Sequence, residues 1–246
     1  MPSSQYSSKR DANFCFPIPN ALENDTIEIV PFIPSKHVEE FFSSSQDEKV
    51  WQYLPIGPFA SPSEFASYWE KHIVSSDQHT LFVILDKTTL KEDGKSPYMA
   101  GMIGYMNSKA VDLVTEIAFV IVFPKFQQSH VASNAVGLLM HYALDLPENG
   151  GLGLRRVQWA AGTKNSASVR LAERMGFKIE GVLKWARILA PAKTIASNGG
   201  PERKGDPRAG CPSSDTALLA VYWDNWENGL REKVDQVMGR RIDSHM

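Results

Sequence analysis

The sequence contains little cysteine and no long hydrophobic run. Its two cysteines, Cys15 and Cys211, stand near opposite ends of the chain and form no Cys-x-x-Cys pair. We therefore expect neither a disulfide framework nor a metal site, and a reducing compartment is the simplest interpretation. The longest apolar stretches, such as residues 117–124, are too short to cross a bilayer, and the N-terminus lacks the apolar core of a secretory signal. These features predict a cytoplasmic protein, with the nucleus left open.

A large net charge is also absent. The chain has 28 acidic residues against 26 Lys and Arg, so its formal net charge is −2. No global field attracts nucleic acid or an anionic membrane, and we expect neither as a partner. The 246 residues are 43% hydrophobic and 22% charged, which is ordinary globular composition. One domain of about 200 residues fits this composition as well as two small domains would.

Two segments show no apolar period. Residues 1–25 are rich in Ser, Asn, Asp and Pro and predict a flexible, loosely attached leader. Residues 191–214 hold Pro, Gly, Ser and charged residues with almost nothing to bury, and predict a mobile insertion. Residues 26–240 then form the predicted single domain.

The remaining segments carry alternating strand and helix patterns. Strands are predicted at 26–32, 80–86, 98–106, 112–123, 156–161, 178–188 and 216–223, and helices at 36–43 continuing to 47–54, from Ser61 or Ser63, and at 129–146, 166–175 and 226–240. This order predicts an α/β protein with a mixed sheet and one central crossover.

The stretch 115–143 combines a carboxylate on a buried strand, a polar turn at 127–130 and a helix. Such a turn exposes unpaired backbone N–H groups beside the positive end of the helix dipole, which can bind phosphate. The alternative is that this turn only connects the strand to the helix and binds no ligand. Further on, Asn165 and Ser168 follow the next strand. The Asn165 amide can satisfy a ligand amide, or Asn165 or Ser166 can cap the helix.

Together these segments resemble the GNAT superfamily of N-acetyltransferases, most closely its RimJ/RimL-like branch, from Asp25 to Trp226. The superfamily's coenzyme A loop reads Gln/Arg-x-x-Gly-x-Gly/Ala, and residues 127–132 read Gln-Gln-Ser-His-Val-Ala. The pairs Gly176-Phe177 and Glu180-Gly181 also match the branch. The resemblance implies the GNAT fold, a mixed central β-sheet splayed in the middle and flanked by helices.

The resemblance further implies an acetyl-CoA-dependent enzyme that transfers the acetyl group to a primary amine, either a protein N-terminus or a small amine. The residues that it places at the coenzyme are Ala118, Phe119, Val120, Gln127, Gln128, Ser129, His130, Val131, Ala132, Ser133, Asn165 and Ser168. It also implies that a backbone N–H of strand 118–122 meets the oxyanion.

Glu116 is the predicted catalytic base. Strand alternation places it among apolar residues, so desolvation should raise its pKa and let it accept a proton near neutral pH. Its position also resembles that of the catalytic Glu in histone acetyltransferases of the superfamily. A carboxylate in water at a strand end, or one paired with an Arg, is the alternative.

The sequence departs from the family pattern at two places. His130 stands where the family pattern has the central Gly of the loop. A Gly at this position lets the backbone approach the pyrophosphate, because it has no Cβ. The His130 ring can crowd the loop, donate to phosphate or face solvent. Many relatives have a general-acid Tyr one turn into the helix after Asn165, but residues 171–173 read Leu-Ala-Glu. Ser168 or a water then protonates the thiolate, or the thiolate leaves unprotonated.

Two other functions remain open. The small residues Ala160, Ala161 and Gly162 leave room for a larger acyl-CoA such as succinyl-CoA. The missing Tyr and the His130 substitution motivate a non-catalytic module that binds coenzyme A. A homodimer is a further expectation, because edge strands expose unpaired backbone groups.

Overall fold

Eight strands form one sheet in the order β1-β2-β3-β4-β5-β6-β8-β7. The computed structural model describes residues 13–240. The strands are β1 Leu22–Glu23, β2 Ile27–Pro31, β3 Thr80–Leu90, β4 Pro97–Lys109, β5 Val114–Val122, β6 Arg156–Gly162, β7 Lys178–Ile188 and β8 Ser213–Tyr222. All neighbours are antiparallel except β5 and β6, which are parallel. The mixed sheet with one crossover, predicted from the sequence, is confirmed.

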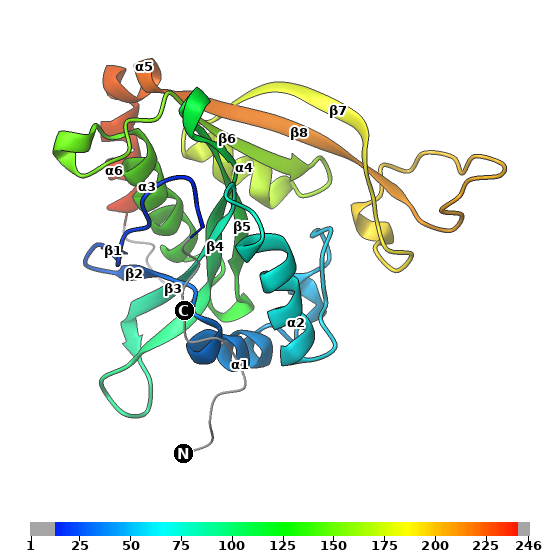
Figure 1. Cartoon of the computed structure of the whole chain (residues 1–246), viewed down its shortest axis with the longest axis horizontal. Coiled ribbons are helices and arrows are strands. Elements are labelled where there is room, and N and C mark those ends of the chain that lie inside the picture. The colour runs from blue at the N-terminus through cyan, green and yellow to red at the C-terminus, as the bar shows by residue number, and fades with distance from the viewer. Residues whose placement is uncertain (1–12, 241–246) are drawn as a thin grey trace.

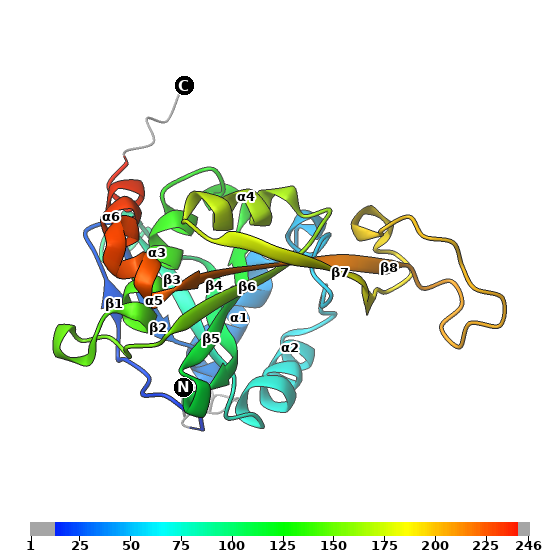
Figure 2. The ribbon, with the colours of Figure 1, turned by 90° about the horizontal axis from the view of Figure 1, so that it is seen from above.

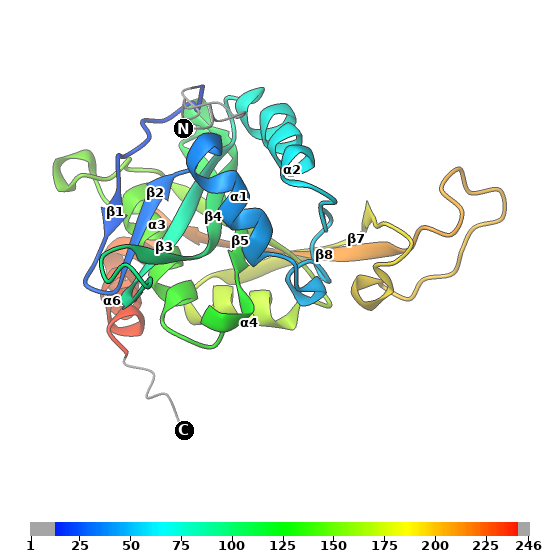
Figure 3. The same ribbon diagram turned by 90° about the horizontal axis from the view of Figure 1, so that it is seen from below.

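Helices cover both faces of this sheet. They are α1 Pro34–Ser44, α2 Pro62–Trp69, α3 Val131–Leu144, α4 Ser166–Arg174, the short α5 Trp223–Asn225 and α6 Arg231–Met238. Figures 2 and 3 show α1 and α2 on one side of the sheet and α4 and α6 on the other. Helix α3 packs against α6 at Gly137, where an added Cβ would lie 2.2 Å from the sulfur of Met238. The prediction of an α/β fold in which helices flank a central sheet is therefore confirmed.

The sheet splays in the middle. Strands β5 and β6 pair only where residues 114–116 of β5 face residues 156–158 of β6. Beyond Glu116, β5 stays with β4 as far as Val122, while β6 stays with β8 as far as Gly162. The β4–β5 register shifts opposite Ala118–Ile121, and Phe119 has a φ of 53°. This irregularity bends β5 away from β6 and opens a gap between them.

The predicted leader differs from the structure where it is described. The side chain of Phe14 is buried, and the Cys15 amide donates to the Asp77 carbonyl at 2.7 Å. The Tyr142 hydroxyl donates to the Pro17 carbonyl at 2.7 Å. Residues 13–25 thus contact the domain, because Phe14 supplies apolar surface that can be buried. The composition of the segment did not indicate this contact. Residues 1–12 lie outside the described part.

The predicted insertion joins β7 to β8 as the end of a long hairpin that projects from the body (Figure 1). The expectation that it has almost nothing to bury is wrong at Lys193, which is 7% exposed. Its ammonium donates to the carbonyls of Trp51, Leu54 and Ile56 at 3.0, 2.6 and 2.6 Å. Mobility of the rest of this segment stays a prediction.

One predicted helix is also wrong. Residues 47–54 form only the 3-10 turn Glu48–Val50, followed by turns. Asp47 caps this turn by accepting from the Lys49 amide at 2.9 Å. Pro55 disfavours helical geometry at the residue before it, so the segment stays a loop. That loop reaches the gap between β5 and β6.

Candidate active site

A cavity of about 250 Å³ opens where β5 and β6 diverge. Its walls come from these two strands, the start of α4, the loop at residues 53–56 and the root of the β7–β8 hairpin. The predicted site residues that line it are Glu116, Ala118, Phe119, Val120, Asn165 and Ser168. The structure therefore brings together the predicted base and five of the twelve predicted coenzyme residues.

Glu116 is a buried carboxylate at the last point where β5 and β6 pair. The residue is 8% exposed, and Asn107 donates its side-chain N–H to Oε2 at 2.9 Å. Burial raises the pKa of Glu116, while the Asn107 hydrogen bond and the charges of Arg187 and His79 lower it by less. The net direction is upward, so Glu116 is a stronger proton acceptor than a carboxylate in water.

Asn165 and Ser168 open helix α4 beside the gap. The Asn165 side-chain oxygen accepts from the Ser168 amide at 3.2 Å, so Asn165 is the helix cap. This leaves the NH2 group of Asn165 as the part that can contact a ligand. The Ser168 hydroxyl accepts from the indole N–H of Trp159 at 3.0 Å. Its own hydrogen is then available to a group in the cavity.

The predicted coenzyme A loop lies at the far end of β5 and does not line the cavity. Gln127 donates its side-chain N–H to the Val122 carbonyl at 3.0 Å, and the Ser129 hydroxyl donates to the Phe126 carbonyl at 2.6 Å. Within the described residues, the backbone amides of Ala132 and Ser133 have no acceptor. These amides at the N-terminus of α3 can bind an anion.

Gln128, His130 and Val131 complete this loop. Gln128 has a φ of 57°, and the Val131 amide donates to the Ser129 hydroxyl at 3.3 Å. The His130 ring has Nε2 at 3.1 Å from Oδ1 of Asp86, a carboxyl group that is 3% exposed. The ring therefore contacts β3, a partner that none of the three alternatives for His130 included. Asp86 lies 44 residues earlier in the chain, beyond local sequence reasoning.

Sequence reasoning missed the residues that complete the cavity from distant segments, namely Tyr53, Tyr68, Arg187, Ser214 and Thr216. It also missed Asn107, the partner of Glu116. An Asn at the end of a predicted strand was a usable signal, because Asn tolerates the left-handed backbone that it adopts here, with a φ of 52°. Strand alternation around Arg187 gave no such signal, since the face of β7 was unknown.

Across the part of the chain that the structure describes, no cluster of His, Cys, Asp and Glu could hold a metal ion. The same residues include no helix that is long and apolar enough to span a membrane. The splayed sheet, with a buried carboxylate in the gap and a helix N-terminus at the end of β5, defines an α/β protein that can bind an extended ligand between its strands.

Residues 27–178 match the family described as Acetyltransferase (GNAT) domain. The match covers more than half of the chain, and the chain belongs to the GNAT acetyltransferases, in the RimJ/RimL-like branch. The protein is thus an acetyltransferase enzyme of this family, whose members use acyl-CoA. The family, the fold and the enzyme class predicted from the sequence are confirmed.

Solved structures with this fold include a GCN5-related N-acetyltransferase from Brucella melitensis, with 24% identity and a TM-score of 0.69 over 91% of this chain and 87% of that chain. Spermidine N-acetyltransferase from Vibrio cholerae, in complex with CoA and spermine, has 14% identity and a TM-score of 0.60 over 83% and 100%. The acetyl transferase from Salmonella typhimurium that modifies the N-terminal serine of 50S ribosomal subunit protein L7/L12 has 19% identity and a TM-score of 0.60 over 82% and 98%. No curated protein matches the sequence.

Proposed function

We propose that the protein transfers the acetyl group of acetyl-CoA to a primary amine, by direct attack of the amine nitrogen on the thioester. The observation that carries this proposal is Glu116, a buried carboxylate with a raised pKa in a cavity between splayed strands. One structure of the same fold contains CoA, which supports this donor class.

The residues present fit an extended thioester. In our proposal the amides of Ala132 and Ser133 bind a phosphate at the N-terminus of α3. The pantetheine arm then follows the free edge of β5 at residues 118–120 and contacts the NH2 group of Asn165. Residues 127–131 form the loop before α3, in which the His130 ring contacts Asp86 of β3.

Bound acetyl-CoA supplies a thioester carbonyl, at which a C–N bond forms while the C–S bond breaks. Glu116 takes one proton from the acceptor ammonium so that the nitrogen lone pair is free, and later releases that proton to solvent. The second amine proton leaves with the thiolate. The Ser168 hydroxyl donates a hydrogen bond toward that sulfur, because Trp159 already occupies its acceptor side. A backbone N–H of β5 stabilises the oxyanion.

The acceptor in this proposal is a protein N-terminus or a small amine that enters past the 53–56 loop and the hairpin root. Proteins of the same fold act on both kinds of amine, spermidine in one case and the N-terminal serine of a ribosomal protein in another. These proteins have low sequence identity to this chain, so they show only that the fold is shared. The identity of the acceptor must therefore be inferred from this chain's own residues.

A larger acyl group is the second candidate. Ala160, Ala161 and Gly162 line the cavity, and a Cβ added at Gly162 would meet no atom within 4 Å. This space can take a longer acyl chain such as succinyl. Comparing turnover of acetyl-CoA and succinyl-CoA with one acceptor decides between the two donors.

The first experiment is isothermal titration of the full chain with acetyl-CoA, with Asn165→Ala beside it. We expect micromolar binding that the substitution weakens. A panel of primary amines, followed by mass spectrometry for a gain of one acetyl group, then tests transfer. Failure to bind acetyl-CoA would exclude the proposal. Binding without acetylation of any amine would count against a primary amine as the acceptor.

A further inference from the structure

Arg187 is the second charged side chain of the active-site cavity. Among the described residues, only Glu116 and Arg187 contribute charge to its lining. The Arg187 side chain makes no hydrogen bond or ion pair within the described chain, whereas Lys184 on the same strand pairs with Asp215 at 2.8 Å. A guanidinium with five N–H donors thus faces the cavity without a protein acceptor.

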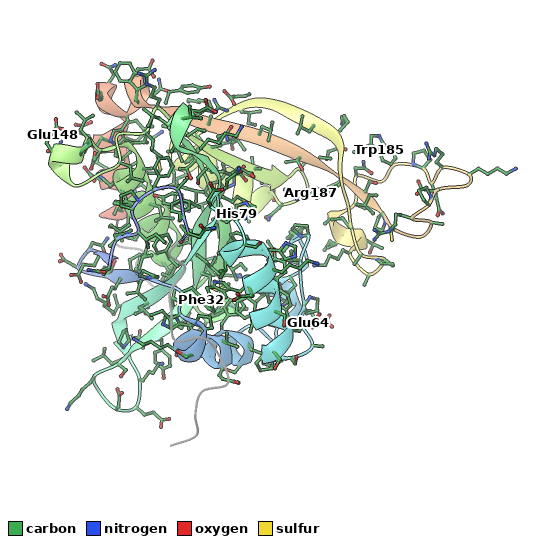
Figure 4. All side chains as sticks on the ribbon, in the orientation of Figure 1. Phe32, Glu64, His79, Glu148, Trp185 and Arg187 are labelled. Atoms are coloured by element: carbon green, nitrogen blue, oxygen red, sulfur yellow. The ribbon has the colours of Figure 1, made fainter. Side chains whose placement is uncertain are left out.

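The charge of Arg187 reaches both walls of the cavity. It lowers the pKa of Glu116 and that of Tyr68 on helix α2, in each case against a larger upward effect of burial. Figure 4 shows Arg187 on the side of the β7–β8 hairpin that faces helix α2. The guanidinium is therefore close to the predicted base, on the side from which an acceptor enters.

Thr216 provides a second, independent observation. It lines the same cavity and is 5% exposed, and its hydroxyl is buried without a hydrogen-bond partner among the described residues. Arg187 lies opposite Ser214 in the β7–β8 ladder, and Thr216 is two residues further along β8 on the same face. A buried hydroxyl with no partner is costly, so this one calls for a ligand atom.

We propose that the acceptor carries a carboxylate close to its amine, and that Arg187 and Thr216 bind this carboxylate while Glu116 faces the amine. The inference rests on the proposed N-acetyltransferase function. A zwitterionic acceptor matches the one carboxylate and one guanidinium of the cavity, and Arg binds a carboxylate with two parallel hydrogen bonds. A polyamine would place its second ammonium against Arg187, which disfavours it.

The carboxylate can belong to a free amino acid or to the acidic N-terminal residue of a peptide. Two matched pairs of probes separate these sources: β-alanine against β-alaninamide, and a tetrapeptide that begins with Asp against the same peptide that begins with Asn. Spermidine completes the set. We expect the wild-type chain to favour the carboxylate member of at least one pair by about tenfold or more in kcat/KM, the scale of one charge-assisted hydrogen bond.

Arg187→Gln should abolish this preference, mainly by raising KM for the carboxylate member. Loss of the Arg187 charge also raises the pKa of Glu116 for both members, so the readout is the ratio of their kcat/KM values at one pH. Arg187→Lys should keep part of the preference because it keeps the charge. Thr216→Val should weaken it. Lys178→Gln, which removes an exposed cation at the other end of β7, should leave it intact. Arg187 and Lys178 are exposed on an edge strand, and Val has nearly the shape of the buried Thr216, so these variants should fold, as circular dichroism can verify.

Equal rates for both members of each pair, or a preference that survives Arg187→Gln, would overturn the inference while acetylation of amines continues. Absence of acetylation with every amine would instead overturn the proposed function on which the inference rests. The pair with the larger preference identifies the source of the carboxylate.

Discussion

At the scale of single residues, the proposed chemistry depends most on Glu116. We predict that Glu116→Gln slows acetylation by about 10²- to 10⁴-fold, the usual contribution of a general base. Burial raises the folded-state pKa of Glu116 above its unfolded value. The free energy of unfolding therefore falls as the pH rises through the folded-state pKa of Glu116 and the buried carboxyl ionises. Glu116→Gln, which stays neutral, should be at least as stable as the wild type at pH 7.

Steady-state rates and thermal denaturation check this prediction. Glu148→Gln is the matched control, because Glu148 is an exposed carboxylate in a loop far from the cavity (Figure 4). Unchanged turnover in Glu116→Gln would remove Glu116 from the base role. A loss of fold in that variant would show that the carboxylate has a structural role instead.

The pH dependence of the reaction should report the surroundings of Glu116. We expect kcat/KM to rise with pH as Glu116 loses its proton. Asn107 donates to its carboxylate and thereby lowers the pKa of Glu116, so Asn107→Ala should move this rise to higher pH. A pH profile of kcat/KM for both proteins measures the shift. A shift to lower pH would contradict the assignment.

Single residues also show which parts of the candidate site can be predicted from the sequence. Glu116 and Asn165 could be chosen from the sequence because each stands at a strand end within a motif of local spacing. Arg187 and Thr216 could not, because their role depends on how the last hairpin folds back beside β6. His130 shows the same limit, since its partner Asp86 belongs to another strand.

At the scale of elements, the predicted strand 178–188 has the same bounds as β7, and the predicted helices at 129–146 and 166–175 overlap α3 and α4. Alternation and helical spacing are local, so they can be read from one segment at a time. The gap between β5 and β6 is not local. It requires a register shift at Phe119 that no residue type indicates. Only the family resemblance predicted the gap.

The gap itself can be tested by filling it. Gly162→Val adds a side chain where a Cβ meets no atom within 4 Å, so the fold should be retained. We predict about tenfold weaker acetyl-CoA binding, because the new side chain occupies the space between the strands. Gly181→Val on β7 is the matched control, since it is equally free of contacts but lies outside the cavity. Titration calorimetry measures both, and equal affinities would refute the prediction.

The contact between the hairpin and the 51–56 loop is a second element-scale feature. Burial lowers the pKa of Lys193 to about 8, so the ammonium that supplies three N–H donors persists at neutral pH. We predict that Lys193→Met raises the acceptor KM more than it lowers kcat, because the loop at residues 53–56 lines the cavity. The free energy of unfolding should fall by about 1–3 kcal/mol, since buried carbonyls lose their donor.

Kinetics and urea denaturation test this role. Lys204→Met is the control, because Lys204 is exposed near the tip of the same hairpin. If Lys193→Met lowered stability but left the acceptor KM unchanged, Lys193 would hold the hairpin without positioning the loop.

At the scale of the whole molecule, the site exists only after segments from every third of the chain meet. The contacts of Lys193 with the loop span 137–142 residues. Composition predicted a mobile insertion there because a lysine normally stays in water. The pairing of the hairpin with the body is a tertiary property, and it has no local pattern.

The whole molecule should respond to its donor as one unit. A ligand that binds only the folded state adds about 2.7 kcal/mol of stability at a concentration of 100 times Kd. For a chain of this size, about 2–4 °C in Tm accompany each kcal/mol, so saturating acetyl-CoA should raise Tm by about 5–10 °C. Glu116→Gln should keep this shift, because it changes proton transfer and not donor binding. Asn165→Ala should reduce the shift, and an undiminished value would place Asn165 outside the donor site.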